Sequence, residues 1–157
     1  MYAALSEQRA PVIESIKNRG VSSGRNDVIL HKTAVIERGL NRIHEVYEGN
    51  RENLTDYTKQ DSIILNIQRA CEASIDLAMH VVSERKLGVP KASREAFRFL
   101  QEANLIEEDL ASSLMNMVGF RNIAVHDYQK LDLDILEAIL EKHIENFRSF
   151  SKIILYM

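Results

Sequence analysis

The sequence is poor in the residues that cross-link a chain or break its helices. It has one cysteine, Cys71, two prolines and six glycines in 157 residues. A single cysteine excludes an intrachain disulfide and a zinc site built on cysteines, and it is typical of a protein kept in a reducing compartment. Cys71 stands in the apolar helical run ILNIQRACEASIDLAMHVV, so we expect a buried small hydrophobe rather than a reactive thiol.

Long uncharged apolar segments are also missing. No apolar stretch reaches the length of about 18 residues that a membrane span requires, and the N-terminus lacks the apolar core of a signal peptide. The expected location is therefore the cytoplasm. The formal charge of −3 argues against general electrostatic binding of nucleic acid, which is typical of strongly basic domains, although a local basic groove remains compatible with it.

Apolar residues recur every three, four and seven positions from Asn26 onward, which predicts helices throughout. The breaks fall at EGNREN, at LGVPKAS and at QKLDLD. We expect Thr58 or Asp61 to cap a long central helix that ends near Lys86, and Ser93 to cap a short one. Strand-like alternation and internal repeats are absent from the sequence. The pattern predicts an all-α, up-and-down antiparallel bundle.

Residues 1–24 differ from the rest of the chain. Pro11 suits the first turn of a short helix, Gly20 suits its C-terminal cap, and GVSSGR is typical of a flexible joint. We therefore expect a short N-terminal helical extension, residues 1–24, followed by a helical bundle domain, residues 25–157.

The stretch GFRNIAVHDY, residues 119–128, gathers polar side chains at the end of an apolar helical run. On a helix, Asn122 and His126 share a face, and Arg121 lies on the adjoining face. A guanidinium group matches phosphate oxygens, and an imidazole exchanges protons near neutral pH. The pair predicts phosphodiester cleavage, with His126 as acid or base and Arg121 stabilising the charge of the transition state.

The same stretch also fits an ordinary polar helix end. A histidine in the last turn interacts favourably with the helix dipole, and we expect Asp127 to cap the backbone, although it could instead orient His126. RNA cleavage needs both an acid and a base, whereas one chain offers a single histidine of this kind. The catalytic interpretation therefore requires a two-fold dimer that brings two such helix ends into one cleft.

The segment RNIAVHDY resembles the Arg-x4-His-x-Tyr signature of the HepT-like toxins, which are helical ribonucleases of the HEPN type. The segments NDVILHKTAVIERGLNRIHEVY, QDSIILNIQRACEASIDLAMHVV and MVGFRNIAVHDYQKLDLDIL also fit the layout of that family. The similarity covers roughly residues 26–155. Residues 1–24 depart from the family pattern and could alter packing against a partner.

The resemblance implies a metal-independent endoribonuclease without a cofactor, which acts as a homodimer and is toxic to its host cell. It implies that Arg121 and His126 form the catalytic pair and that Asn122 is the polar residue that follows the arginine. It also implies that Tyr128 receives AMP from a cognate MntA-like nucleotidyltransferase antitoxin, in a type VII toxin–antitoxin system. The added adenylate would then compete with RNA phosphate for Arg121.

Residues 85–98 carry five cations against one acid, Glu95, a local charge of +4. Lys91, Arg94 and Arg98 are candidate contacts to RNA or to an acidic partner surface, although a solvated turn is the simpler interpretation.

The sequence lacks the residues that a metal site or a nucleotide-binding site would need. His80 and Glu84 have the spacing of two helical metal ligands but no companions, so we expect no metal. The sequence has no glycine-rich phosphate loop, and we do not expect nucleotidyl transfer by this chain itself.

A second interpretation belongs to a different functional class. The chain could be a non-catalytic helical binding partner of a minimal nucleotidyltransferase, in which the same motif serves only as acceptor and docking site. The two interpretations share Tyr128 as the modified residue and differ in whether the chain cuts RNA.

Overall fold

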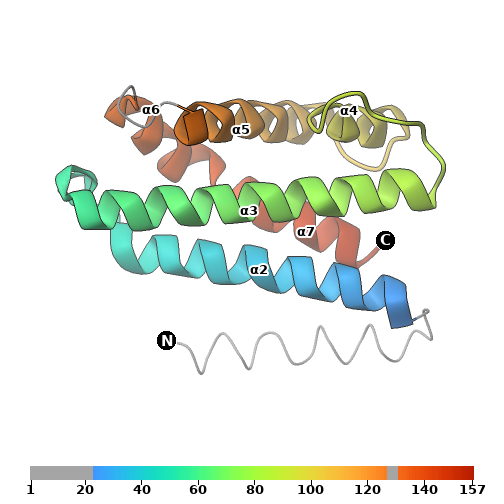
Figure 1. Ribbon diagram of the computed structural model, residues 1–157, viewed down its shortest axis with the longest axis horizontal. Coiled ribbons are helices and arrows are strands. Elements are labelled where there is room, and N and C mark those ends of the chain that lie inside the picture. Colours follow the sequence, from blue (N-terminus) through green and yellow to red (C-terminus); the bar gives the residue numbers. More distant parts are fainter. Residues whose placement is uncertain (1–22, 127–130) are drawn as a thin grey trace.

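The computed structural model describes the backbone of residues 23–126 and 131–157, and within these ranges every regular element is helical. Two long helices, α2 (Ser23–Tyr47) and α3 (Tyr57–Glu84), run antiparallel and side by side, joined by the 3-10 turn η1 (Figure 1). The remaining elements are α4 (Glu95–Glu102), α5 (Glu108–His126), α6 (Leu133–Ala138), the π-helical turn η3 (Ile139–His143) and α7 (Glu145–Leu155), with η1 at Arg51–Thr55. The expected all-α bundle is confirmed.

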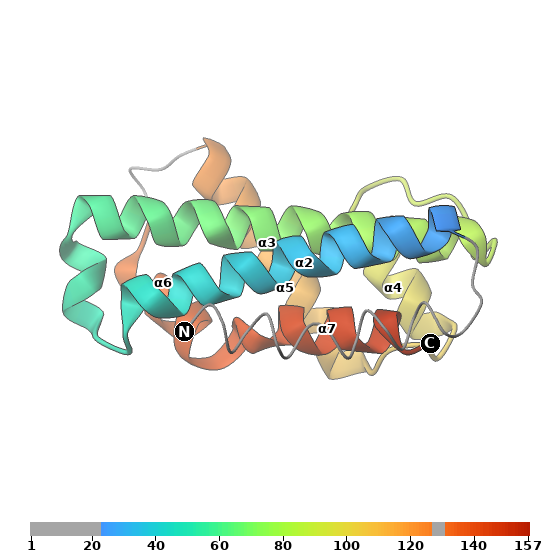
Figure 2. The same ribbon diagram turned by 90° about the horizontal axis from the view of Figure 1, so that it is seen from below.

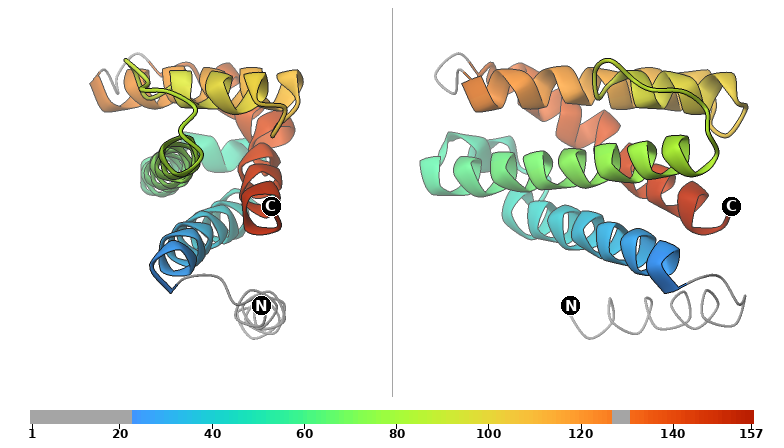
Figure 3. Two further views of the ribbon diagram at one scale, coloured as in Figure 1. Left: turned by 90° about the vertical axis from the view of Figure 1, so that its right-hand side faces the viewer. Right: turned by 45° about the vertical axis from the view of Figure 1, so that its right-hand side comes forward.

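The central helix is α3, which packs against α2, α4, α5 and α7. An end-on view shows α2, α3 and α5 in successive layers, with α7 alongside them (Figure 3). Because α3 has neighbours on several sides, it is buried over much of its circumference, as its sequence predicts. Its fully buried side chains include Ile63, Ile64, Ile67 and Leu77.

The close packing of α2 on α3 depends on one glycine. A Cβ atom on Gly39 would lie 3.2 Å from the backbone oxygen of Asn66 and 3.8 Å from the Cβ of Ala70. The distance of 3.2 Å is shorter than an ordinary van der Waals contact. The missing side chain therefore lets the two helices approach at this point.

Two expected helix caps are wrong. The N-cap of α3 is Asp56, whose carboxylate accepts from the backbone N–H of Lys59 at 3.0 Å, and not Thr58 or Asp61. Helix α4 begins after Arg94 without a side-chain cap, because Ser93 contributes only its backbone oxygen, to the N–H of Ala96.

Helix α2 begins at Ser23, so the flexible joint expected in GVSSGR does not extend through residues 23 and 24. Residues 1–22 lie outside the described residues. The division of the chain at residue 24 stays a prediction.

The final helical segment is interrupted rather than continuous. Asp132 caps α6, its carboxylate accepting from the backbone N–H of Asp134 at 2.8 Å. The π-helical turn η3 follows, and the N–H of Ile144 reaches back five residues to the oxygen of Ile139 at 2.9 Å. Helix α7 follows this turn, and its Phe147 and Phe150 are buried in the core. Within the described ranges, no helix is long and apolar enough to cross a membrane.

Candidate active site at the end of α5

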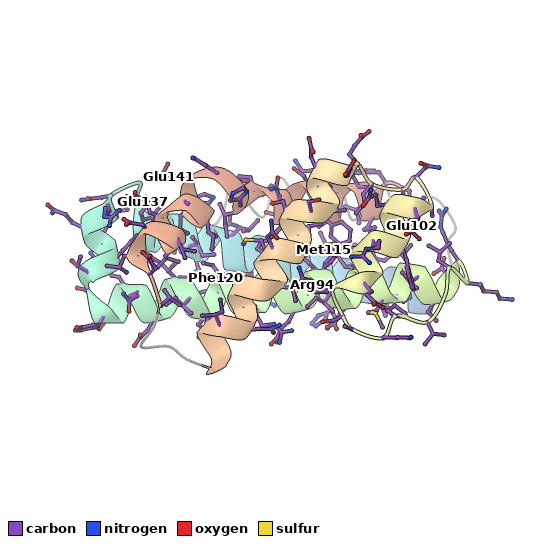
Figure 4. The ribbon with its side chains drawn as sticks, turned by 90° about the horizontal axis from the view of Figure 1, so that it is seen from above. Arg94, Glu102, Met115, Phe120, Glu137 and Glu141 are labelled. Atoms are coloured by element: carbon purple, nitrogen blue, oxygen red, sulfur yellow. The ribbon has the colours of Figure 1, made fainter. Side chains whose placement is uncertain are left out.

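Helix α5 carries the Arg-x4-His segment in its last two turns. Glu108 and Asp109 stand in its first turn, where negative charge favours the helix N-terminus. Phe120 and Ala124 are buried and fix the inner face of the helix against the core, so that Arg121, between them in sequence, lies at the edge of that face. The C-terminal part of α5 crosses α3 and projects past it (Figures 2 and 4).

The side chain of Arg121 reaches from α5 onto α3. Its Nη1 lies 3.6 Å from Oε1 of Glu72, and the two side chains are 22% and 60% exposed. The Nε of Arg121 is buried and has no hydrogen-bond partner. The stem of Arg121 is thus packed, whereas its tip meets an exposed carboxylate.

This ion pair is loose. A charge-assisted N–H···O bond usually spans about 2.7–2.9 Å, and the Arg121–Glu72 pair at 3.6 Å is longer. An exposed ion pair of this kind contributes about 0–1 kcal/mol. The pairing with Glu72 therefore holds the guanidinium only weakly.

Cys71 lies beside this pair on α3. Burial raises the pKa of its thiol to about 12, although the positive charge of Arg121 acts in the opposite direction. The thiol is 1% exposed and stays protonated at neutral pH. The expectation of a buried, unreactive cysteine is confirmed for its burial and is supported by this pKa.

The other predicted residues of the motif are only partly described. Asn122 is exposed next to Arg121, and His126 is the last residue of α5, described through its backbone only. Asp127 and Tyr128 lie outside the described residues. The spatial relation of Arg121 to the His126 and Tyr128 side chains stays a prediction.

The basic segment lies near the other end of α5. Lys91, Arg94 and Arg98 are exposed, and the backbone N–H of Lys91 donates to Oε2 of Glu95 at 2.8 Å. Helix α4 lies beside the N-terminal part of α5, away from its C-terminal end (Figure 1). The role of these three cations as RNA or partner contacts stays a prediction.

The sequence interpretation did not anticipate the contact between Arg121 and Glu72. Helix α3 exposes a stripe of residues at spacings of three and four, which consists of Leu65, Arg69, Glu72, Asp76 and Met79. The sequence signal for an exposed face was the presence of charged residues at this spacing in an otherwise apolar helix. The pairing of Glu72 with Arg121 could not be predicted from this spacing, because it joins residues of two separate helices.

Metal ligands do not cluster in the described part of the chain. No group of three or more His, Cys, Asp or Glu side chains there is arranged to hold an ion. The spaced pair His80 and Glu84 does meet, at 3.3 Å between Nε2 and Oε2, but without a third ligand.

The chain is similar to known nucleases over most of its length. A family model described as Ribonuclease HepT-like matches residues 36–154. The mRNA nuclease HepT of Shewanella oneidensis is 47% identical over 129 residues, which cover 82% of this chain and 97% of that protein. The tRNA nuclease HepT of Aphanizomenon flos-aquae is 32% identical over 66 residues, 42% of this chain and 45% of that protein.

Solved structures agree with these relatives. The tri-AMPylated Shewanella oneidensis HEPN toxin in complex with MNT antitoxin has a TM-score of 0.79 and 46% identity, covering 83% of this chain and 98% of that one. A toxin–antitoxin structure with AMP-PNP has a TM-score of 0.77 at 46% identity, covering 82% and 98%. The family match spans well over half of the chain, and both relatives are nucleases. This chain belongs to the HepT-like family and is a ribonuclease.

Proposed function

We propose that this ribonuclease is the toxin of a toxin–antitoxin pair and cleaves mRNA at a site formed by Arg121 and His126. The observation that carries the proposal is the placement of Arg121, whose packed stem holds a loosely paired guanidinium at the protein surface. The 47% identity to an mRNA nuclease supports this choice of substrate.

The chemistry follows from the two side chains. Arg121 holds the scissile phosphate and stabilises the negative charge that develops on its oxygens, since guanidinium donors match them in geometry and charge. His126 moves a proton at the ribose 2′-oxygen or at the leaving 5′-oxygen. Asn122, exposed beside Arg121, is proposed to bind the RNA backbone. The reaction needs no metal, because charge stabilisation and proton transfer are both supplied by side chains.

We further propose that the active form is a homodimer whose two Arg121–His126 segments face one cleft. The apolar side chain of Ile123, which lies between Arg121 and His126 in the sequence, is 54% exposed and is therefore available to an interface at this end of α5.

Regulation is proposed to act through Tyr128 and a cognate nucleotidyltransferase antitoxin, as AMPylation and an MNT antitoxin accompany the similar Shewanella toxin. An adenylate two residues from His126 adds bulk and negative charge where RNA phosphate must bind. If Tyr128→Phe were neutralised by the antitoxin as well as the wild type, this switch would be wrong.

The nuclease itself is tested with purified wild type and His126→Ala on mRNA in EDTA. We expect wild-type cleavage and a loss of about 10²-fold or more in the variant, the usual contribution of a general acid or base. Cleavage that survives His126→Ala would contradict the assignment. If neither protein cuts RNA but the antitoxin still adenylates Tyr128, the chain is a binding partner and not the nuclease proposed here.

A further inference from the structure

The proposed reaction lacks one proton carrier within a single chain. Cleavage at the ribose 2′-oxygen requires a base for the 2′-hydroxyl and an acid for the leaving 5′-oxygen. The Arg121–His126 segment offers one histidine. A second group must come either from a partner copy or from another element of the same chain.

The structure places a carboxylate at the catalytic arginine. Oε1 of Glu72 lies 3.6 Å from Nη1 of Arg121, and the Glu72 side chain is 60% exposed on the outer face of α3. We propose that Glu72 is the general base of the reaction, acting on the same phosphodiester that Arg121 holds. This inference rests on the proposed function, because it takes Arg121 as the phosphate-binding group.

The position of Glu72 agrees with this role. The Glu72 carboxylate borders the guanidinium of Arg121, and the attacking 2′-hydroxyl belongs to the nucleotide whose phosphate that guanidinium is proposed to hold. The carboxylate is accessible, and it is not tied up elsewhere by any ion pair except that with Arg121 in the described part of the chain. The positive charge of Arg121 also reduces the repulsion between the carboxylate and the anionic RNA.

The other groups near Glu72 that could accept a proton are paired or already protonated, so Glu72 is the available base. On α3 the charged neighbours of Glu72 are Arg69, one turn earlier, and Asp76, one turn later. Asp76 is paired with Lys32 of α2 at 2.9 Å. From α5 the only charged group at Glu72 in the described residues is Arg121, and the adjacent Cys71 thiol is buried and protonated.

The step balances without a further reactant. The Glu72 carboxylate takes the proton of the 2′-hydroxyl while O2′ forms a bond to phosphorus. The bond from phosphorus to O5′ breaks, its electron pair stays on O5′, and protonated His126 donates the proton to that oxygen. The products are a 2′,3′-cyclic phosphate and a 5′-hydroxyl, and Glu72 and His126 have exchanged protonation states.

The test compares Glu72→Gln with wild type in single-turnover cleavage of a short RNA across pH 4 to 9. Glutamine keeps the shape and the contact to Arg121 but cannot accept the proton. We expect a fall in the cleavage rate of about 10²-fold or more, loss of the acidic limb of the pH profile, and an unchanged KM. Glu72→Asp should recover part of the rate, and Arg69→Gln, one turn away, should keep the acidic limb.

Two results would contradict the proposed role of Glu72. A Glu72→Gln rate within a few-fold of wild type would overturn the proposal. So would a loss confined to KM with the acidic limb intact, which would make Glu72 a positioning residue for Arg121. Circular dichroism of each variant checks the fold. If wild type fails to cut RNA, or if His126→Ala still cuts it, the proposed function fails instead, and that result is separate from the Glu72 comparison.

Discussion

At the scale of single residues, the proposed phosphate-binding site depends on a contrast within Arg121. The Nε and stem are buried, whereas the terminal nitrogens reach an exposed carboxylate. Burial of the stem limits the conformations of a long side chain, so less entropy is lost when a phosphate binds. The loose pair with Glu72 keeps the guanidinium in place without holding it tightly. The guanidinium of Arg121 is thus held in a position from which it can bind an anion.

The thiol of Cys71, beside Arg121, should be nearly inert in the folded protein. Burial raises its pKa to about 12, so at pH 8 the thiolate fraction is roughly 10³-fold below that of an ordinary cysteine. We expect an aromatic disulfide reagent to label the native protein at least about 10²-fold more slowly than the protein in guanidinium chloride. Equal labelling rates in the two states would show that the site around Arg121 opens readily.

At the scale of elements, the end of α2 is joined to the final helical segment by a buried phenol. The hydroxyl of Tyr47 donates to Oε1 of Glu141 at 2.5 Å, and Tyr47 is 5% exposed. Burial first, and then the hydrogen bond and charge of Glu141, raise its pKa to about 12. Nearby, Arg51 pairs with Asp134 at 2.6 Å and Glu137 at 3.0 Å, which fixes α6 directly after the segment that contains Tyr128.

The raised pKa of Tyr47 predicts a stability change at alkaline pH. The folded state favours the protonated phenol, so its contribution is complete below about pH 10 and is lost as the pH rises from about 10 to 12. We expect roughly 1–2 kcal/mol of lost stability over this range, less than the full pKa difference implies because Glu141 is exposed to solvent.

Urea unfolding of wild type and Tyr47→Phe at several pH values measures this loss. The variant should be less stable by about 1 kcal/mol at neutral pH and should show a shallower decline above pH 10. Parallel declines in the two proteins would mean that Tyr47 does not titrate in this range.

Periodicity predicts the existence of the helices but not their ends. Several side chains near Tyr57 can cap a helix, and the chain uses Asp56 because its carboxylate reaches the N–H of Lys59. The π-helical turn at Ile139–His143 leaves the apolar stripe almost unchanged, so a pattern of threes and fours does not reveal it. These choices depend on packing between elements.

The residues of the candidate site also differ in whether the sequence alone can predict them. Arg121 and Asn122 are predictable as candidate residues, because the motif is local to one helix. Glu72 is not, because the contact joins α3 to α5 and depends on how steeply the two helices cross. A contact of this kind requires the fold.

At the scale of the whole molecule, the end of α5 projects beyond α3 and exposes Ile123. If two copies meet there, Ile123→Asp should turn a dimer into a monomer and reduce RNA cleavage, since a buried aspartate without a partner costs several kcal/mol. Light scattering after size-exclusion chromatography measures the mass. Val89→Asp, at an even more exposed site after α3, is the matched control and should leave the dimer intact. A monomeric wild type that cuts RNA would contradict the shared cleft.

The central claim is that Arg121 binds the scissile phosphate, and the single-turnover cleavage rate of a defined RNA tests it most directly. Wild type, Arg121→Ala and Arg121→Lys are compared in EDTA, with Arg38→Ala, an exposed arginine of α2, as the control. We predict that the alanine variant loses about 10²-fold or more of the rate, and that lysine restores only part of it because it lacks the planar fork. Arg121→Ala that cleaves RNA at the rate of Arg38→Ala would contradict the account.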